Sequence, residues 1–274
     1  MNELAGKVAA VTGAASGLGR AMALAFASEG MHLALADLDE PGLAQTRKQL
    51  PQGARNFSMR VDVSKGEEVE AFAQHCVSEL GGIHLVCNNA GVALSGAAWE
   101  NSEAEWQWIL GVNLWGVVHG VRAFAPRLIA QDEGHIVNTA SVAGLISPPG
   151  MAAYSASKHA VVALSEALRH DLAERGSRVG VSVLCPAYVP TGIADSRFPE
   201  PVVKSTERLA KEAALRKAVA AGKLSADDVA RAVVAAVKEN RFYVLTHPAI
   251  KGAVRARMED VLEGRAPRDP LRLK

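Results

Sequence analysis

A regular alternation of short apolar runs with longer helical stretches constrains the fold of this 274-residue chain more than any other feature. The apolar runs are largely unbroken rather than alternating with polar residues, which is typical of strands covered on both faces of a sheet. Such strands are expected at residues 7–12, 32–36, 57–63, 83–89, 135–140, 179–185 and 241–247. Helices are expected between them, at 18–29, 41–50, 66–80, 102–130, 152–175 and 226–239.

These repeated strand–helix units predict an α/β fold built on one doubly wound parallel sheet. Right-handed crossovers would place helices on both faces of about seven strands. No internal repeat or linker interrupts the pattern, so residues 1–247 are expected to form a single domain. Two less regular stretches are interpreted as a mobile flap near the site, at about 186–224, and a C-terminal tail at 248–274. The tail could be a subunit contact or a frayed end.

The composition favours a small-molecule partner. The 30 Lys and Arg residues nearly balance 29 Asp and Glu residues, so the net charge of +1 gives no reason to expect nucleic acid or an anionic membrane surface as a partner. No targeting segment precedes the first strand, and no apolar stretch approaches the roughly 18 residues that a membrane span requires.

The cysteines indicate a reducing compartment. Cys76, Cys87 and Cys185 are odd in number, widely spaced and set in apolar runs, which indicates buried free thiols rather than disulfides or a metal site. A cytoplasmic location is therefore expected.

A glycine-rich segment follows the first expected strand. In "TGAASGLG", residues 12–19, Gly13, Gly17 and Gly19 open the first helix with the spacing G-x-x-x-G-x-G. Glycine allows the backbone to turn tightly and to approach a pyrophosphate, whose charge is stabilised by free N–H groups at the helix N-terminus. By itself the cluster could also be a plain strand-to-helix turn.

An acidic residue ends the second expected strand. Asp37 lies 18 residues after Gly19, where a carboxylate would meet an adenosine ribose. It can accept hydrogen bonds from both ribose hydroxyls but would repel a 2′-phosphate, which favours NAD over NADP. No Lys or Arg occurs at 14–16 or at 38, and Arg20 is expected to be committed to the first helical turn. Asp37 could instead be a solvated loop acid beside Asp39 and Glu40.

The stretch "AAYSASKHAV", residues 152–161, places a phenol and an amine on one helix face. Tyr154 and Lys158 are separated by four positions, so both side chains project in the same direction. A free tyrosine titrates near pH 10, and a neighbouring ammonium stabilises its phenolate form. The same spacing also occurs in ordinary pairs on helix surfaces. It indicates a catalytic pair only in combination with the glycine-rich segment.

With these features together, the sequence resembles the short-chain dehydrogenase/reductase family over nearly all of residues 5–247. The matching motifs are "TGAASGLG" at 12–19, "DV" at 62–63, "NNAG" at 88–91, "GVNLWG" around Asn113, "IVNTAS" at 136–141, "YSASK" at 154–158 and "CPAYVPT" at 185–191. The resemblance implies a Rossmann fold and an oxidoreductase that uses NAD. It also implies homo-oligomers, tetramers or dimers, formed through the long helices at 102–130 and 152–175.

The resemblance also assigns roles to individual residues. Tyr154 would be the general acid/base, and Lys158 would hold the nicotinamide ribose and depress the tyrosine pKa. Ser141 would bind the substrate oxygen, and Asn113 would fix a water that connects Lys158 to solvent. The residues assigned to the cofactor are Gly13, Ser16, Gly17, Leu18, Gly19, Asp37, Leu38, Asp62, Val63, Asn89, Ala90, Gly91, Tyr154, Lys158, Pro186, Val189 and Thr191. In isolation, Ser141 could merely end a strand and Thr191 could begin a turn.

The substrate region is expected to be mostly apolar. By family analogy the substrate would contact Ser141, Leu145, Met151, Tyr154, Tyr188 and Ile193, with Leu94, Val142, Pro148 and Phe198 nearby. This set favours a hydrophobic secondary alcohol or ketone that is cyclic, aromatic or terpenoid-like. His159 and the four tryptophans, Trp99, Trp106, Trp108 and Trp115, are interpreted as packing or interface residues. Ala187 departs from the family's usual glycine, which would matter only if the site required positive φ.

Two alternatives stay open at this level. A 3-ketoacyl-type reductase would prefer NADPH, which Asp37 argues against. A non-catalytic nucleotide-binding module would be expected to lack part of the Asn113, Ser141, Tyr154 and Lys158 set, all of which are present.

Overall fold

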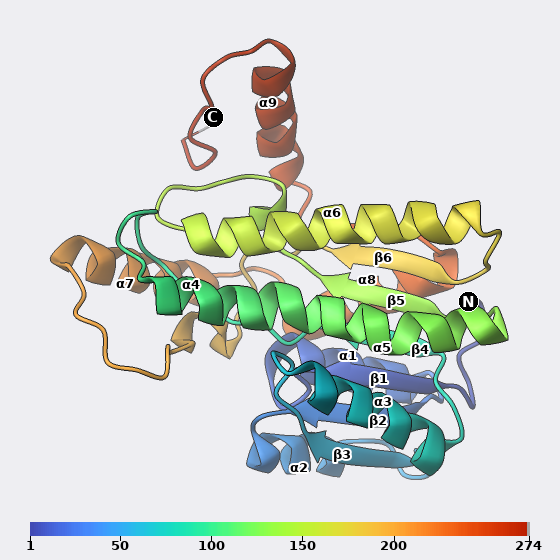
Figure 1. The fold of residues 1–274 in the computed structure, drawn as a ribbon. Helices are drawn as coiled ribbons and strands as arrows, with labels where there is room; N and C mark the ends of the chain where they lie inside the picture. Colours follow the sequence, from blue (N-terminus) through green and yellow to red (C-terminus); the bar gives the residue numbers. More distant parts are fainter. Residues whose placement is uncertain (273–274) are drawn as a thin grey trace.

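The computed structural model describes residues 1–272 and contains one seven-stranded parallel sheet flanked by helices (Figure 1). The strands are β1 (Val8–Thr12), β2 (His32–Asp37), β3 (Asn56–Arg60), β4 (Leu85–Asn88), β5 (His135–Thr139), β6 (Gly180–Leu184) and β7 (Tyr243–Val244). Their order in the sheet is β3-β2-β1-β4-β5-β6-β7. The predicted Rossmann-type fold, with helices on both faces, is therefore confirmed.

The helices largely follow the expected positions. They are α1 (Gly17–Ser28), α2 (Glu40–Lys48), α3 (Gly66–Leu80), α4 (Glu103–Leu110), α5 (Gly116–Gln131), α6 (Ala152–Glu174), α7 (Thr206–Ala220), α8 (Ala226–Glu239) and α9 (Ile250–Leu262). No helix within residues 1–272 is long and apolar enough to cross a membrane.

Side chains on the two faces of the sheet form two cores. In β1, Ala9 and Val11 point to one face, where α1 and α8 pack, while Val8 and Ala10 point to the other, which α3 and α5 cover. All these strand residues are almost fully buried. Because both faces are covered, the strands show unbroken apolar runs in the sequence.

The helix expected at 102–130 contains a local irregularity. Ser102 begins α4 with a capping box in which its hydroxyl accepts from the Glu105 backbone N–H and the Glu105 carboxylate accepts from the Ser102 N–H. After α4 the chain forms a π-helical segment, Gly111–Trp115, which leads directly into α5, so the three segments form one long helix. Asn113 lies within this segment and is fully buried. A π-bulge inside a long helix is frequent at functional sites.

Helix α7 lies in the stretch interpreted as a mobile flap. Its first turn is capped by Ser205, whose hydroxyl accepts from the Arg208 backbone N–H at 3.0 Å. The sequence analysis missed this helix because its mean hydropathy is low and only Arg208 and Val219 are buried. The mobility of 186–224 stays a prediction.

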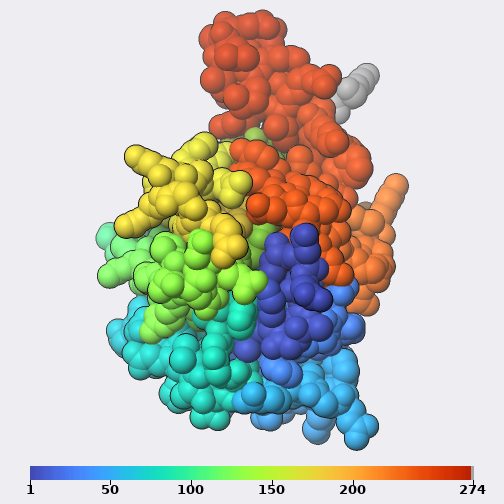
Figure 2. Space-filling view, turned by 90° about the vertical axis from the view of Figure 1, so that its right-hand side faces the viewer, coloured from blue at the N-terminus to red at the C-terminus, as the bar shows by residue number. Residues whose placement is uncertain are grey.

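Helix α9 lies in the stretch interpreted as a tail, whose last two residues fall outside the described range. The chain turns back after α9 because the buried Asp260 carboxylate accepts from the backbone N–H of Arg268 at 3.1 Å and from its Nε at 3.0 Å. In Figures 1 and 2 this segment, coloured red, projects from the rest of the molecule.

Candidate active site

A large cavity opens at the carboxyl ends of the strands. After β1 the chain continues to β2 on one side of the sheet, and after β4 it continues to β5 on the other side. The strand order therefore reverses between β1 and β4. Ligands bind at such switch points in open α/β sheets. The cavity has a volume of about 790 Å³, and it receives every one of the residues assigned above to cofactor binding.

The glycine-rich segment forms the floor beside β1. Gly13 and Gly17 have φ values of 68° and 50°, which favour glycine. A Cβ on Gly19 would overlap the Gly13 carbonyl and lie 2.8 Å from Asn89 Nδ2. Thr12 Oγ1 accepts from the Asn89 N–H at 2.9 Å, tying this turn to the end of β4. The glycines therefore keep a cradle open that larger side chains would fill.

Asp37 is fixed at the end of β2. Its Oδ2 accepts from the Ala15 N–H at 2.9 Å, and its Oδ1 accepts from the Asp39 N–H at 3.1 Å. These bonds hold the carboxylate at the cavity wall. Arg20 instead reaches across to α2, where its Nε donates to Thr46 Oγ1 at 2.9 Å, and it does not line the cavity.

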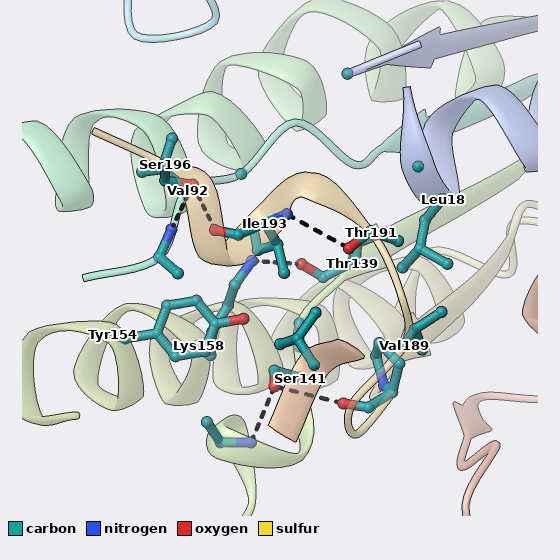
Figure 3. Close-up of a pocket in the computed structure, with 18 of the residues that line it drawn as sticks. Leu18, Val92, Thr139, Ser141, Tyr154, Lys158, Val189, Thr191, Ile193 and Ser196 are labelled. Atoms are coloured by element: carbon teal, nitrogen blue, oxygen red, sulfur yellow. Dashed lines mark hydrogen bonds between the residues drawn. The ribbon is translucent and has the colours of Figure 1, made fainter. Parts of the chain in front are cut away.

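Tyr154 and Lys158 extend from α6 into the middle of the cavity (Figure 3). Lys158 Nζ lies 5.8 Å from the Tyr154 ring centroid and donates to the Thr139 carbonyl at 3.0 Å. Burial lowers the pKa of Lys158 to about 8. Burial also raises the pKa of Tyr154, whereas a hydrogen bond with the Ser141 hydroxyl acts to lower it. Burial therefore opposes the phenolate form of Tyr154.

Ser141 and Asn113 hold the backbone around this pair. Ser141 Oγ accepts from the Ala143 N–H at 3.1 Å and donates to the Pro186 carbonyl at 3.4 Å. The Asn113 amide accepts from the Val92 N–H at 2.8 Å and donates to the Val92 carbonyl at 2.9 Å. Asn113 therefore lies behind the cavity wall rather than in it, because the π-helical segment turns its side chain toward the loop after β4.

Ala187 replaces the family's usual glycine without backbone strain. Its φ is not positive, so an alanine is accommodated as readily as a glycine. The Ala187 N–H donates to His247 Nδ1 at 3.2 Å. The substitution leaves the loop between β6 and Thr191 in place at the cavity wall.

The comparisons agree with this geometry. The family model described as "short chain dehydrogenase" matches residues 7–201. The chain belongs to this family. It is therefore an oxidoreductase of the short-chain dehydrogenase/reductase type.

Known proteins are similar to this chain over most of its length. A crystal structure of a short-chain dehydrogenase/reductase from Burkholderia phymatum in complex with NAD is 52% identical, covers 100% of both chains and has a TM-score of 0.97. The CLA biosynthesis dehydrogenase/reductase of Lactiplantibacillus plantarum is 34% identical over 277 residues, with 97% of each chain covered. The 1-deoxy-11-beta-hydroxypentalenate dehydrogenase of Streptomyces exfoliatus is 36% identical over 259 residues, covering 93% of this chain and 88% of its own.

The residues expected around the substrate line the cavity only in part. Met151, Tyr188 and Ile193 line the cavity, as do Val142 and Pro148. Leu145 does not, because the short 3-10 turn Val142–Gly144 directs it into a neighbouring core, and Ile146 takes the place at the wall.

Two further residues of the expected neighbourhood pack elsewhere. Leu94 is buried against Ile109 and Ala153. Phe198 packs its ring edge-on against Trp108, with centroids 5.7 Å apart.

Sequence reasoning missed several wall residues. They come from α4, the flap, α7 and the segment after β7, and include Trp108, Ser196, Arg197, Leu215, Val219, Ile250, Ala253, Pro270 and Leu271. Trp108 was interpreted as a packing or interface residue, whereas it lines the cavity. No single spacing in the sequence links these positions, because they are distributed over separate elements that meet only in the folded protein.

Proposed function

We propose that this protein is an NAD-dependent dehydrogenase that interconverts a hydrophobic secondary alcohol and its ketone. The observation that carries the proposal is the convergence of Ser141, Tyr154 and Lys158 on the cavity that also receives the glycine-rich turn. The position of the Asp37 carboxylate supports NAD as the cofactor, because it would repel a 2′-phosphate. The NAD complex of the 52% identical relative agrees with this choice.

The residues present fit NAD. The open cradle at Gly13, Gly17 and Gly19 would take the pyrophosphate at the N-terminus of α1. Asp37 would accept from the adenosine ribose, and Lys158 Nζ would donate to the nicotinamide ribose. When bound, NAD supplies the hydride acceptor.

The protein's own groups would handle the proton. Ser141 Oγ orients the substrate hydroxyl, and Tyr154 Oη removes its proton as hydride leaves the carbinol carbon. In ketone reduction Tyr154 returns the proton to the carbonyl oxygen. Because burial raises the pKa of Tyr154, the positive charges of Lys158 and of the oxidised cofactor are required to favour its phenolate. Asn113 keeps the loop around Val92 in place behind Lys158.

The cavity wall at the substrate end supports an apolar substrate. Trp108, Ile146, Met151, Leu215 and Val219 offer hydrocarbon surface there. By their names, one relative above acts on 1-deoxy-11-beta-hydroxypentalenate and another takes part in CLA biosynthesis. We propose an apolar substrate class, and no particular compound, for the present protein.

The test is NADH formation across a panel of apolar and sugar secondary alcohols, with NAD and NADP compared. We expect turnover with NAD on an apolar alcohol, at a rate that rises with pH as Tyr154 loses its proton. Tyr154→Phe should abolish turnover, whereas Tyr188→Phe, which keeps the aromatic ring at the wall, should retain it. A preference for NADP would contradict the assignment of Asp37, and NAD binding without turnover on any alcohol would favour a non-catalytic module.

Two properties belong with this proposal. The cysteines Cys76, Cys87 and Cys185 are buried free thiols, which supports a cytoplasmic protein. A homodimer or homotetramer through α4, α5 and α6 is supported by Trp115, a large side chain that is half-exposed on this helical face.

A further inference from the structure

We propose that the substrate carries a carboxylate remote from its reacting carbon, and that Arg197 binds this group. The inference rests on the proposed function and narrows its substrate class to apolar hydroxy acids and keto acids.

The charges in the cavity are unevenly distributed. Of the described residues that line it, four carry a formal charge: Asp37, Asp62, Lys158 and Arg197. Asp37 ends β2, and Asp62 follows β3 and accepts from Ser64, so both acids belong to the adenosine side. Lys158 lies in the middle, beside Tyr154. Arg197 is thus the single charged wall residue on the substrate side within residues 1–272.

The backbone on both sides of Arg197 is held in place. Ser196 Oγ accepts from the Ala93 N–H at 3.1 Å and donates to the Ile193 carbonyl at 2.7 Å. On the other side, the Phe198 ring contacts Trp108 of α4. Figure 3 shows Ser196 beside Val92, well separated from Leu18 of the glycine-rich turn. Arg197 is therefore anchored at the substrate end and not at the pyrophosphate cradle.

The Arg197 guanidinium is available to a ligand. Among the described residues no carboxylate lies within 4.0 Å of it, and Asp195, two positions earlier in the chain, pairs with Arg216 at 3.3 Å instead. Arg197 is exposed at the cavity rim. A guanidinium presents parallel N–H donors that match both oxygens of a carboxylate, and such charge-assisted bonds are stronger than neutral ones.

The apolar residues of the same cavity explain why the rest of the substrate would be apolar. Trp108, Met151 and Ile193 line it together with Tyr154 and Arg197, and they offer little hydrogen bonding to a sugar. A hydrocarbon body that ends in a carboxylate satisfies both the apolar wall and the unpaired cation at its rim.

The experiment measures binding rather than turnover. Decanoate and methyl decanoate are titrated by calorimetry into the enzyme saturated with NAD, at low ionic strength. We expect decanoate to bind roughly tenfold more tightly than the ester, as one charge-assisted interaction allows. Arg197→Met should remove this preference while leaving affinity for the ester and for NAD unchanged, and Arg197→Lys should retain part of it. The matched control is Arg231→Met on α8, an exposed arginine outside this cavity, which should behave as wild type.

Two results would overturn the inference. One is a wild-type enzyme that binds the acid no better than the ester, and the other is a preference that survives in Arg197→Met. A loss of NAD affinity in Arg197→Met, with the acid preference kept, would assign the arginine to the cofactor. Since binding requires no hydride transfer, these results are separate from the alcohol panel, whose failure would instead contradict the proposed function.

Discussion

The proposed cofactor side and the proposed substrate side of the cavity are built in different ways. The cofactor side consists of short turns at the ends of adjacent strands, such as residues 12–19 after β1 and 89–91 after β4. The substrate side consists of side chains from α4, the loop after β6, α7 and the segment after β7. One side is shaped by backbone conformation and the other by helices that meet only in the folded protein.

This difference predicts different sensitivities. On the cofactor side a single added methyl group conflicts with fixed backbone atoms. On the substrate side the wall depends on how helices are anchored to one another. The anchor is the ion pair between Glu105 of α4 and Arg208 of α7, whose side chains are 0% and 2% exposed. Arg208 Nη1 donates to Glu105 Oε2 at 3.2 Å, and Nη2 donates to Oε1.

The largest effect is expected from Gly19→Val. The new side chain would collide with the Gly13 carbonyl and with Asn89, so NAD affinity should fall by roughly 100-fold or more. Gly192→Ala is the matched control on the substrate side, since a Cβ there meets nothing within 4 Å. Fluorescence titration with NADH measures both. An equal loss of NAD affinity in the two variants would contradict the view that backbone conformation shapes the cofactor side.

The second effect concerns Arg208→Met. Removing one partner of a buried ion pair typically costs 3–5 kcal/mol, which here corresponds to a decrease in Tm of roughly 10 °C. Because α7 carries Leu215 and Val219 of the wall, KM for the alcohol should rise while the affinity for NAD stays unchanged. The control is Lys211→Met, which removes a more exposed pair with Glu207 and should shift Tm little. A uniform loss of alcohol and NAD binding would show that the two sides are not separable.

A smaller effect is expected in the pH dependence of stability. Burial alone would raise the pKa of Glu105, but its bonds to Arg208 and Ser102 hold the pKa below the usual 4.5. The pair's contribution is therefore complete above about pH 4.5 and is lost as the pH falls through the lower pKa of the folded protein. Denaturant unfolding between pH 3 and 7 should show this acid loss in the wild type and a shallower slope in Glu105→Gln. An unchanged slope would exclude Glu105 as a contributor.

The smallest effect is expected from Leu271→Ala. Leu271 lines the cavity but is 60% exposed, so its truncation removes little buried apolar surface. KM for a bulky alcohol should rise a few-fold, with no change in KM for NAD. Leu262→Ala on α9 is the control, because this residue is exposed and lies outside the cavity. An effect of the same size in both variants would indicate a general loosening of the segment.

The sequence alone determined the sheet, the glycine-rich turn, Asp37 and the shared face of Tyr154 and Lys158. Each of these depends on contacts between near neighbours: apolar runs form strands, positive φ requires glycine, and a separation of four residues aligns two side chains on a helix. The sequence also indicated that Ala187 in place of the usual glycine would matter only at a positive φ, and the φ of Ala187 is not positive. Such a condition can be stated from the sequence because φ is a local property.

Tertiary structure alone decided the substrate side. Glu105 and Arg208 lie 103 positions apart, and the sequence around either residue does not indicate that the two form an ion pair. Ile146 lines the cavity in place of Leu145, which follows a short 3-10 turn and packs against a neighbouring core. Trp108, Arg197 and Leu271 meet one cavity only after α4, the loop after β6 and the C-terminal segment have packed. Local sequence patterns specify backbone conformation. Contacts between residues that are distant in the sequence depend instead on which surfaces the complete fold brings together.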